Sequence, residues 1–272
     1  MTAPAQLPPF SFPLFVPANR PDRIAKALGA STDTVIVDLE DAVPADDKDV
    51  ARSHLEQSLA PESTRSIWLR INAPGTVWHE SDVSHAASLP VSAIMVAKSE
   101  DADVLQAIRK TLTPSQLLIA LVESAKGVQN CEAIAAASDR MAFGSIDFAL
   151  DIGSDHARDA LSFARSRLVI AARAARQPAP LDGVTTAVGD TSLIADDAAY
   201  ARSMGFGGKL LIHPGQIAPA RAGFQPQPAE LDWARRIVAN SKDSGAAAID
   251  GEMIDAPVLQ RAQAILERAG EA

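Results

Sequence analysis

Cysteine is nearly absent from this sequence. Cys131 is the only cysteine among 272 residues, so the chain can form neither an intrachain disulfide nor a cysteine-based zinc site. No apolar run approaches the ~20 residues that span a bilayer, and residues 1–9 lack the charged and apolar regions of a signal peptide. We therefore expect a cytoplasmic protein with no membrane partner.

Positive charge is also scarce. The 25 Lys and Arg residues are outnumbered by 34 Asp and Glu residues, which gives a formal net charge of -9, and the basic residues form no block. Nucleic acids and anionic membranes attract proteins through positive potential, so we expect neither as a partner. An anionic ligand must instead be bound by individual Arg or Lys side chains.

Several common site motifs are missing too. The sequence has no GxGxxG after its first predicted strand, no GxxxxGK[ST] loop, no HExxH and no GxSxG elbow after a strand. Dinucleotide-binding folds, P-loop enzymes and Ser-His-Asp hydrolases therefore lose support.

Aliphatic residues are abundant. Hydrophobic residues make up 47% of the chain and aromatic residues only 4%, so the chain can bury a sizeable aliphatic core. Short apolar runs alternate with segments of helical period. The runs predict eight strands, at 13–18, 34–40, 66–73, 93–98, 117–123, 141–147, 183–188 and 209–213. Helices are predicted at 21–30, 46–59, 101–112, 128–137, 157–176, 192–204, 229–241 and 257–269.

Repeated βα units require parallel strands joined by crossover helices. The strands are almost continuously apolar, as expected when both faces of a sheet are covered. We therefore predict a (β/α)8 TIM barrel over residues 1–223, with an open doubly wound sheet of eight strands as the alternative. Residues 224–272 are too short for an independent domain, so we expect a helical extension that packs on the barrel or on a neighbouring subunit.

Polar residues follow the predicted strands, at the end of a barrel where active sites lie. They are Asp38, Glu40, Asp41, Arg70, Asn72, Lys98, Glu123, Asp147 and His213. Glu123 and Asp147 close consecutive predicted strands, so two carboxylates are expected to face one cavity. Like charges this close require a cation, and Mg²⁺ suits oxygen ligands. The alternative is that each acid caps the following helix or pairs with a local base.

Four basic side chains are candidates for binding an anion. Arg70 can bind a carboxylate or an enolate-like oxygen through two donors, and a salt bridge to an acid of the strand at 34–40 is an alternative that does not exclude this. Arg20 and Arg23 flank a helix start, where amides suit a phosphate or carboxylate. Lys209 follows a glycine-rich segment, for which a plain turn is the simpler interpretation. His213 fits a structural hydrogen bond as well as a catalytic role.

Several segments together resemble the citrate lyase β-subunit-like proteins, the group of malyl-CoA, citramalyl-CoA and citryl-CoA lyases. The matching segments are Leu14-Phe15-Val16-Pro17 with Arg20-Pro21, Asp38-Leu39-Glu40-Asp41-Ala42-Val43, Arg70-Ile71-Asn72, Val122-Glu123-Ser124, Phe143-Gly144 with Asp147 and Asp151-Ile152-Gly153, Gly205-Phe206 through Lys209 to Ile212-His213-Pro214 and Gln216, and Gly251-Glu252-Met253-Ile254-Asp255-Ala256-Pro257. The similarity extends over nearly the whole chain.

The resemblance implies roles for individual residues. Glu123 and Asp147 are expected to bind Mg²⁺, Arg70 to contact the substrate, and Asp255 to be an acid/base group delivered by the tail of a neighbouring subunit. Glu40 and Asp41 match positions that hold metal-bound waters in this family. The same resemblance implies a homotrimer or a multiple of it. Two segments depart from the family: the first loop has Pro-Ala-Asn where Pro-Gly is usual, and Ala97-Lys98 stands where Pro-Lys is usual.

The resulting hypothesis is a Mg²⁺-dependent lyase that cleaves or forms a 3-hydroxy acyl-CoA thioester, such as citryl-CoA, malyl-CoA or citramalyl-CoA, to give an acyl-CoA and a 2-keto acid. Arg20 and Lys98 join Arg70 and Glu123 as predicted substrate contacts. One alternative is a class II aldolase acting on free pyruvate-type keto acids, and another is a non-catalytic keto-acid or CoA-binding subunit of a larger lyase complex. The sequence leaves open which acid is used and whether thioester hydrolysis follows cleavage.

Overall fold

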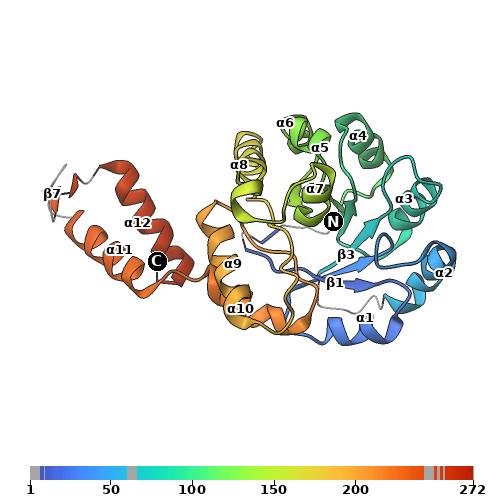
Figure 1. Cartoon of the computed structure of the whole chain (residues 1–272), viewed down its shortest axis with the longest axis horizontal. Coiled ribbons are helices and arrows are strands. Elements are labelled where there is room, and N and C mark those ends of the chain that lie inside the picture. Colours follow the sequence, from blue (N-terminus) through green and yellow to red (C-terminus); the bar gives the residue numbers. More distant parts are fainter. Residues whose placement is uncertain are drawn as a thin grey trace.

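A parallel sheet of six strands forms the centre of the molecule (Figure 1). The structure is a computed structural model that describes residues 7–8, 10–59, 66–241, 248–249, 252–253 and 255–271. The strands pair in sequence order and are β1 (Leu14–Pro17), β2 (Thr34–Asp38), β3 (Ser66–Ile71), β4 (Ala93–Val96), β5 (Leu117–Val122) and β6 (Arg140–Phe143). The sheet is a half-barrel, so the predicted βα architecture is confirmed for these six strands.

Helices follow the strands and surround the sheet (Figure 1). They are α1 (Pro21–Leu28), α2 (Lys48–Ser58), α3 (His79–Ser88), α4 (Ala102–Thr111), α5 (Ala125–Gln129), α6 (Cys131–Ala137), α7 (Ser145–Asp151), α8 (Arg158–Ala174), α9 (Thr191–Ser203), α10 (Ile217–Phe224), α11 (Pro228–Ser241) and α12 (Ala256–Ala269), with short 3-10 turns η1 (Ala45–Asp47) and η2 (Pro214–Gln216) and a small hairpin of β7 (Ala248–Ile249) and β8 (Glu252–Met253). Among the described helices, none is long and apolar enough to cross a bilayer.

Each strand is buried on both faces because alternate side chains enter two different cores. Ile36 and Trp68 belong to a cluster inside the curved sheet, which also takes in Met95 from β4. Val35 and Leu69, one position away from the first two, pack in the larger cluster between the sheet and the helices. This double burial explains why the strands are almost continuously apolar.

The regular strands predicted at 183–188 and 209–213, and with them the full eight-stranded barrel, are not confirmed. The structure has only single parallel bridges in this region, Ala142 to Leu181, Asp182 to Lys209, Ser11 to Gly208 and Leu14 to Leu211. Backbone carbonyls of 183–188 accept hydrogen bonds from side chains instead of from a neighbouring strand. Gln216 Nε2 donates to the carbonyl oxygens of Thr185 (2.8 Å) and Ala187 (3.0 Å). These bonds satisfy the backbone without a strand ladder.

A buried ionic cluster lies beside these bridges. Lys209 is 2% exposed, and its Nζ donates to the Gly183 carbonyl (2.5 Å) and lies 3.5 Å from Asp182. Arg165 Nε donates to the other oxygen of Asp182 at 2.9 Å. Lys209 therefore ties two segments of the fold together, and the structure does not support its candidacy for binding an external anion.

Other boundaries also differ from the predictions. The strand predicted at 141–147 ends at Phe143, because Gly144 turns the chain into α7. The single helix predicted at 128–137 is two short helices that meet at Asn130. Helices α3, α7 and α10 were not predicted.

Helices α11 and α12 form a hairpin that projects from the half-barrel (Figure 1). They pack on each other through a separate small core that includes Ala234, Ile237, Ala262 and Ile265. An ion pair joins the hairpin to α9, with Arg202 Nη2 2.9 Å from Glu230 Oε2. Residues 242–247 and Gly251 and Ile254 of the terminal motif lie outside the described residues.

Gly208 is expected to be the most sensitive glycine of the bridged region. It has φ of 152°, and a Cβ there would overlap the carbonyl group of Ser11. Gly208→Ala should lower the free energy of unfolding by about 3 kcal/mol or more. The melting temperature measured by circular dichroism should then fall by about 6–12 °C. Gly189→Ala is the matched control, because its Cβ would meet open space, and equal melting temperatures for the two variants would contradict the prediction.

Candidate active site

A cavity of about 330 Å³ lies at the carboxyl ends of the strands. Its polar wall brings together Asp41, Arg70, Glu123 and Asp147, four residues predicted for the site. The apolar wall includes Phe15, Leu121, Phe143, Val184 and Leu210. Four distant parts of the chain therefore converge on one small space, as strand ends do in barrel enzymes.

Arg70 is held by the acids that follow β2. Its Nε and Nη2 donate to the two carboxylate oxygens of Asp38, each at 2.6 Å, and its Nη1 lies 3.0 Å from Glu40 Oε2. Burial alone would lower the pKa of Arg70, but Asp38 and Glu40 raise it above its ordinary value. The ring of Phe15 lies 4.9 Å from the guanidinium carbon. The predicted salt bridge to an acid after β2 is thus present, and it fixes the guanidinium at the cavity wall.

Glu40 and Asp41 differ in exposure. Glu40 is buried, accepts the Asp41 backbone amide at 3.1 Å, and has its pKa raised to about 7 by burial. Lys48 Nζ donates to the Glu40 carbonyl at 2.9 Å, which holds this turn in place. Asp41 is exposed, and its carboxylate lies 3.6 Å from Arg70 Nη1. Glu40 does not line the cavity. It contacts Arg70, which does.

Glu123 is a second buried carboxylate of the cavity, beside Asp38. It is 3% exposed, and its Oε1 accepts the backbone amide of Lys98 at 2.7 Å. Lys98 adopts φ of 46°, an uncommon conformation for a non-glycine residue, and so presents its amide to Glu123. Burial raises the pKa of Glu123 to about 8, Arg70 opposes this, and the charges of Glu40 and Asp147 add to it. A Cβ at Gly144 would collide with Glu123, so glycine is required beside this side chain.

Asp147 does not end a strand, which corrects its predicted placement. It is the third residue of α7 and lines the cavity from the first turn of that helix. Its charge nevertheless acts on Glu123, as the expected pairing of the two carboxylates requires. Among the described residues, no group of three or more His, Cys, Asp and Glu side chains is arranged to hold a metal.

A divalent cation fits the donors that are present. Mg²⁺ commonly takes one or two protein carboxylates and completes its octahedron with water and substrate oxygens. Glu123 and Asp147 supply two such carboxylates at one cavity wall. A cation there would also offset the cost of burying the charge of Glu123.

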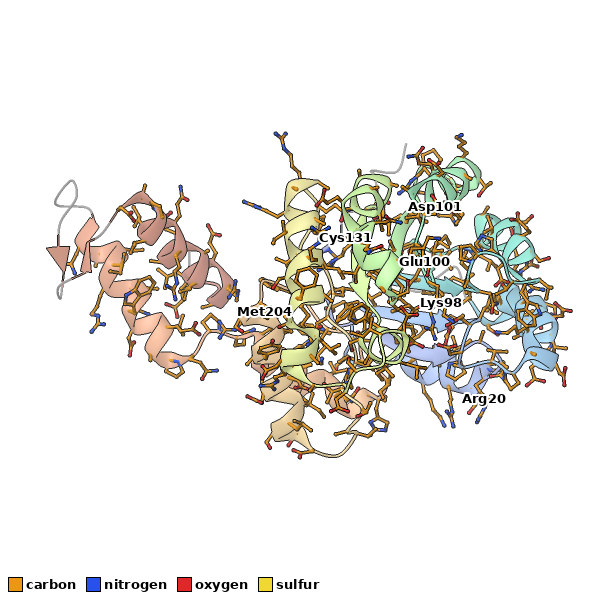
Figure 2. All side chains as sticks on the ribbon, turned by 45° about the horizontal axis from the view of Figure 1, so that its top comes forward. Arg20, Lys98, Glu100, Asp101, Cys131 and Met204 are labelled. Atoms are coloured by element: carbon orange, nitrogen blue, oxygen red, sulfur yellow. The ribbon has the colours of Figure 1, made fainter. Side chains whose placement is uncertain are left out.

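Lys98 and Arg20 lie outside this cavity. The Lys98 side chain is half exposed and lines a different cavity of about 380 Å³, with Glu100 and Lys126. Arg20 pairs with Asp22 at 3.2 Å and lines a third cavity of about 480 Å³. Figure 2 labels Arg20 at the edge of the molecule and Lys98 nearer to its centre.

The third cavity adjoins the first. Phe15 and Ile212 line both, and the third cavity adds the basic side chains of Arg20, Arg23 and Lys26. His213 also lines it, but its Nδ1 accepts the Gly215 amide at 3.0 Å and so serves the local turn. The expected pair of arginines is therefore present at a helix start next to the candidate site.

Asp255 lies at the start of α12, in the hairpin that projects from the half-barrel (Figure 1). It is the N-cap of α12, where its Oδ1 accepts the Val258 amide at 3.1 Å, and it is exposed. It does not line any of the three cavities described here. The chain does not bring its own Asp255 to the cavity that holds Arg70 and Glu123.

Sequence reasoning missed a serine at the cavity wall and a histidine that is hydrogen-bonded to it. Ser145 lines the cavity, and its Oγ lies 2.9 Å from His156 Nε2. The two residues are eleven positions apart, with helix α7 between them, so no familiar motif spacing marks the pair.

A parallel α/β half-barrel with a polar cavity at its strand ends defines the general class of barrel enzymes. More specifically, the chain belongs to the HpcH/HpaI aldolase/citrate lyase family, whose model matches residues 11–214. It is therefore an enzyme of the aldolase and lyase group.

Known proteins of this family resemble the chain over nearly its full length. A citrate lyase subunit beta-like protein of Mycobacterium tuberculosis is 38% identical and aligns over 95% of each chain. A (3S)-malyl-CoA thioesterase of Cereibacter sphaeroides is 34% identical over 97% of this chain and 96% of its own. Among solved structures, CitE of Mycobacterium tuberculosis in complex with magnesium, acetoacetate and coenzyme A has a TM-score of 0.86 and 36% identity, over 96% of this chain and 98% of its own.

Proposed function

We propose that this protein is a Mg²⁺-dependent carbon-carbon lyase acting on a 3-hydroxy acyl-CoA thioester, such as citryl-CoA, malyl-CoA or citramalyl-CoA. Its products are an acyl-CoA and a 2-keto acid. The observation that carries the proposal is the cavity in which the buried carboxylate of Glu123 meets Asp147 and Arg70. Related structures that contain magnesium with acetoacetate and coenzyme A, or with oxaloacetate, support it.

Glu123 and Asp147 are the proposed Mg²⁺ ligands, with Glu40 and Asp41 holding waters around the ion. When bound, Mg²⁺ supplies a Lewis acid that polarises the carbonyl of the keto acid. Glu123 keeps its orientation through the Lys98 amide, so Lys98 acts on the site through its backbone. Its half-exposed ammonium group lies 4.0 Å from Glu40 Oε1 and is also the proposed contact for an anionic part of the substrate.

Arg70 is the proposed stabiliser of developing negative charge. Carbon-carbon cleavage leaves an enolate oxygen on the thioester half, and a guanidinium is a strong donor to such an oxygen. Asp38 binds two of its nitrogens and thereby fixes its plane before the substrate enters. A donor that is already oriented loses little entropy when the charge develops.

The adjoining cavity is the proposed site of the CoA end of the substrate. Arg20, Arg23 and Lys26 give it a basic wall, which suits phosphate groups. Because Phe15 and Ile212 line both cavities, a bound thioester can extend from one into the other. The wider proposal includes a cytoplasmic homotrimer, or a multiple of it, in which the extension 224–272 packs on a neighbour and Asp255 completes that neighbour's site. It also includes a (β/α)8 barrel in which the two bridged segments stand for strands seven and eight.

Product formation from two kinds of substrate tests this function. With Mg²⁺, the purified full-length protein should release a keto acid from malyl-CoA or citramalyl-CoA, detected by a coupled dehydrogenase, but not from the free 4-hydroxy-2-keto acids of class II aldolases. Cleavage of the free acids alone would favour the aldolase alternative. Tight binding of keto acid or CoA without turnover would favour a subunit of a larger lyase complex.

A further inference from the structure

A fourth cavity, of about 280 Å³, lies at the amino ends of the strands, the end opposite to the candidate active site. Phe12 and Asp33 line it just before β1 and β2 begin. Arg221 and Phe224 reach it from α10, and Arg268 reaches it from α12. The cavity therefore lies where the projecting hairpin meets the half-barrel.

Two guanidinium groups stack on aromatic rings at this cavity. The guanidinium carbon of Arg268 lies 5.3 Å from the centre of the Phe10 ring, and that of Arg221 lies 6.0 Å from the centre of the Phe12 ring. Both rings pack against the edge or face of Phe224, at centroid distances of 6.3 and 5.2 Å. The two arginines thus flank one aromatic cluster. A guanidinium that stacks through its face keeps its N–H donors at its edge for another partner.

Arg268 carries a buried donor that lacks an acceptor. Its Nε has no hydrogen-bond partner among the residues that the structure describes. Glu230 is the acid that acts on its charge, but Arg202 already binds both carboxylate oxygens of Glu230, at 3.2 and 2.9 Å. Burial and the charge of Arg202 lower the pKa of Arg268, and Glu230 opposes them. An anion beside Arg268 would therefore offset the cost of this cation.

Arg221 is engaged more weakly than the arginines of the protein interior. Its Nη2 donates to Asp33 Oδ2 at 2.8 Å, in a pair whose side chains are 36% and 60% exposed. Exposed ion pairs of this kind contribute little to stability, so an anion can compete for the same guanidinium. The cavity lining contains two arginines and one aspartate, which makes it locally positive in a chain of net charge -9.

We propose that this cavity binds a small organic oxyanion, with its carboxylate or phosphate head between Arg221 and Arg268 and its apolar body against Phe10. Guanidinium groups bind both kinds of head through two donors. Because Arg268 belongs to the hairpin and Arg221 to the half-barrel, the ligand ties these two parts of the molecule together. The inference does not depend on the proposed lyase function, since Arg70, Glu123 and the other groups of that site do not line this cavity.

Calorimetry on the full-length protein with benzoate, phenyl phosphate and benzamide tests the site. Benzamide has nearly the shape of benzoate without its charge, so we expect one or both of the anions to bind and benzamide not to bind. The tighter anion identifies the head group as carboxylate or phosphate. Its affinity should fall by about 10–100-fold in Arg268→Gln and in Arg221→Gln, the range for loss of charge-assisted hydrogen bonds.

Two further variants distinguish binding from a structural role. Asp33→Asn should bind the anion several-fold more tightly, because it removes the carboxylate that competes for Arg221. Arg261→Gln is the matched control and should keep wild-type affinity. Arg261 lies on the same helix as Arg268 and stacks on Trp233 at 5.1 Å, but it does not line the cavity.

Hydrogen exchange measured by mass spectrometry tests whether the ligand joins the two parts. The bound anion should slow amide exchange in both α10 and α12 of the wild type and in neither helix of Arg268→Gln. Slower exchange in only one of the two helices would contradict the bridging position. No binding of either anion, or equal affinity in the wild type and a folded Arg268→Gln, would overturn the proposal. A smaller assembly mass of Arg268→Gln by light scattering would also overturn it, because Arg268 would then contact a neighbouring subunit.

Discussion

Replacing Glu123 by Gln is expected to lower kcat/KM for thioester cleavage by roughly 10³-fold or more, and to abolish Mg²⁺ binding at the site. Glutamine has nearly the same shape, so its carbonyl oxygen can still accept the Lys98 amide that now binds Oε1. What disappears is the negative charge, and the amide nitrogen would take the place of an oxygen ligand. The expected loss is therefore one of metal affinity and not of folding.

Stability measurements separate these two effects. Because burial raises the pKa of Glu123, the charged carboxylate is costly in the metal-free fold, and a neutral side chain should leave the melting temperature unchanged or higher. Mg²⁺ should raise the melting temperature of the wild type but not of Glu123→Gln. Glu132→Gln is the control, since this exposed acid of α6 pairs with Arg167 and does not line the cavity. Equal Mg²⁺ affinity by calorimetry in the wild type and Glu123→Gln would refute the assignment.

The sequence predicts the sheet well where burial alone decides the structure. The segment 34–40 is continuously apolar up to Asp38, and β2 ends at that residue. The prediction of strands fails where side chains, and not a neighbouring strand, form the hydrogen bonds to the backbone. Gln216 lies outside the segment 183–188 whose carbonyls it binds, and nothing in the local pattern of that segment indicates this partner.

The same distinction applies to the site. The positions of Arg70 and Glu123 at the ends of predicted strands indicate that the two side chains converge, because the carboxyl ends of barrel strands lie around one opening. Asp147 reaches the cavity by another route, from a helix that begins right after β6, and the Gly144-Ser145 pair is the signal that the strand stops early. Contact between Ser145 and His156 depends on how the loop after α7 returns, which no sequence period encodes.

Replacing Asp255 by Asn is expected to lower kcat by about 10²–10⁴-fold, as for loss of a general acid or base. Asparagine is as good an N-cap as aspartate, so the bond to the Val258 amide and the fold of α12 should survive. Mg²⁺ affinity should also survive, since Asp255 is not at the cavity of its own chain. Asp190→Asn is the control, because Asp190 caps α9 through the Leu193 amide in the same way and should keep full activity.

Mixing two inactive variants tests whether Asp255 acts in a neighbouring subunit. If each site combines Glu123 of one subunit with Asp255 of another, subunits exchanged between Asp255→Asn and Glu123→Gln form some sites with both native residues. Random association at equal amounts should restore roughly a quarter of wild-type activity, because each interface draws its two sides independently. If Asp255 served its own chain, every site would lack one residue and mixing would restore nothing. The mass of the assembly, measured by light scattering before and after exchange, verifies that the subunits associate and mix.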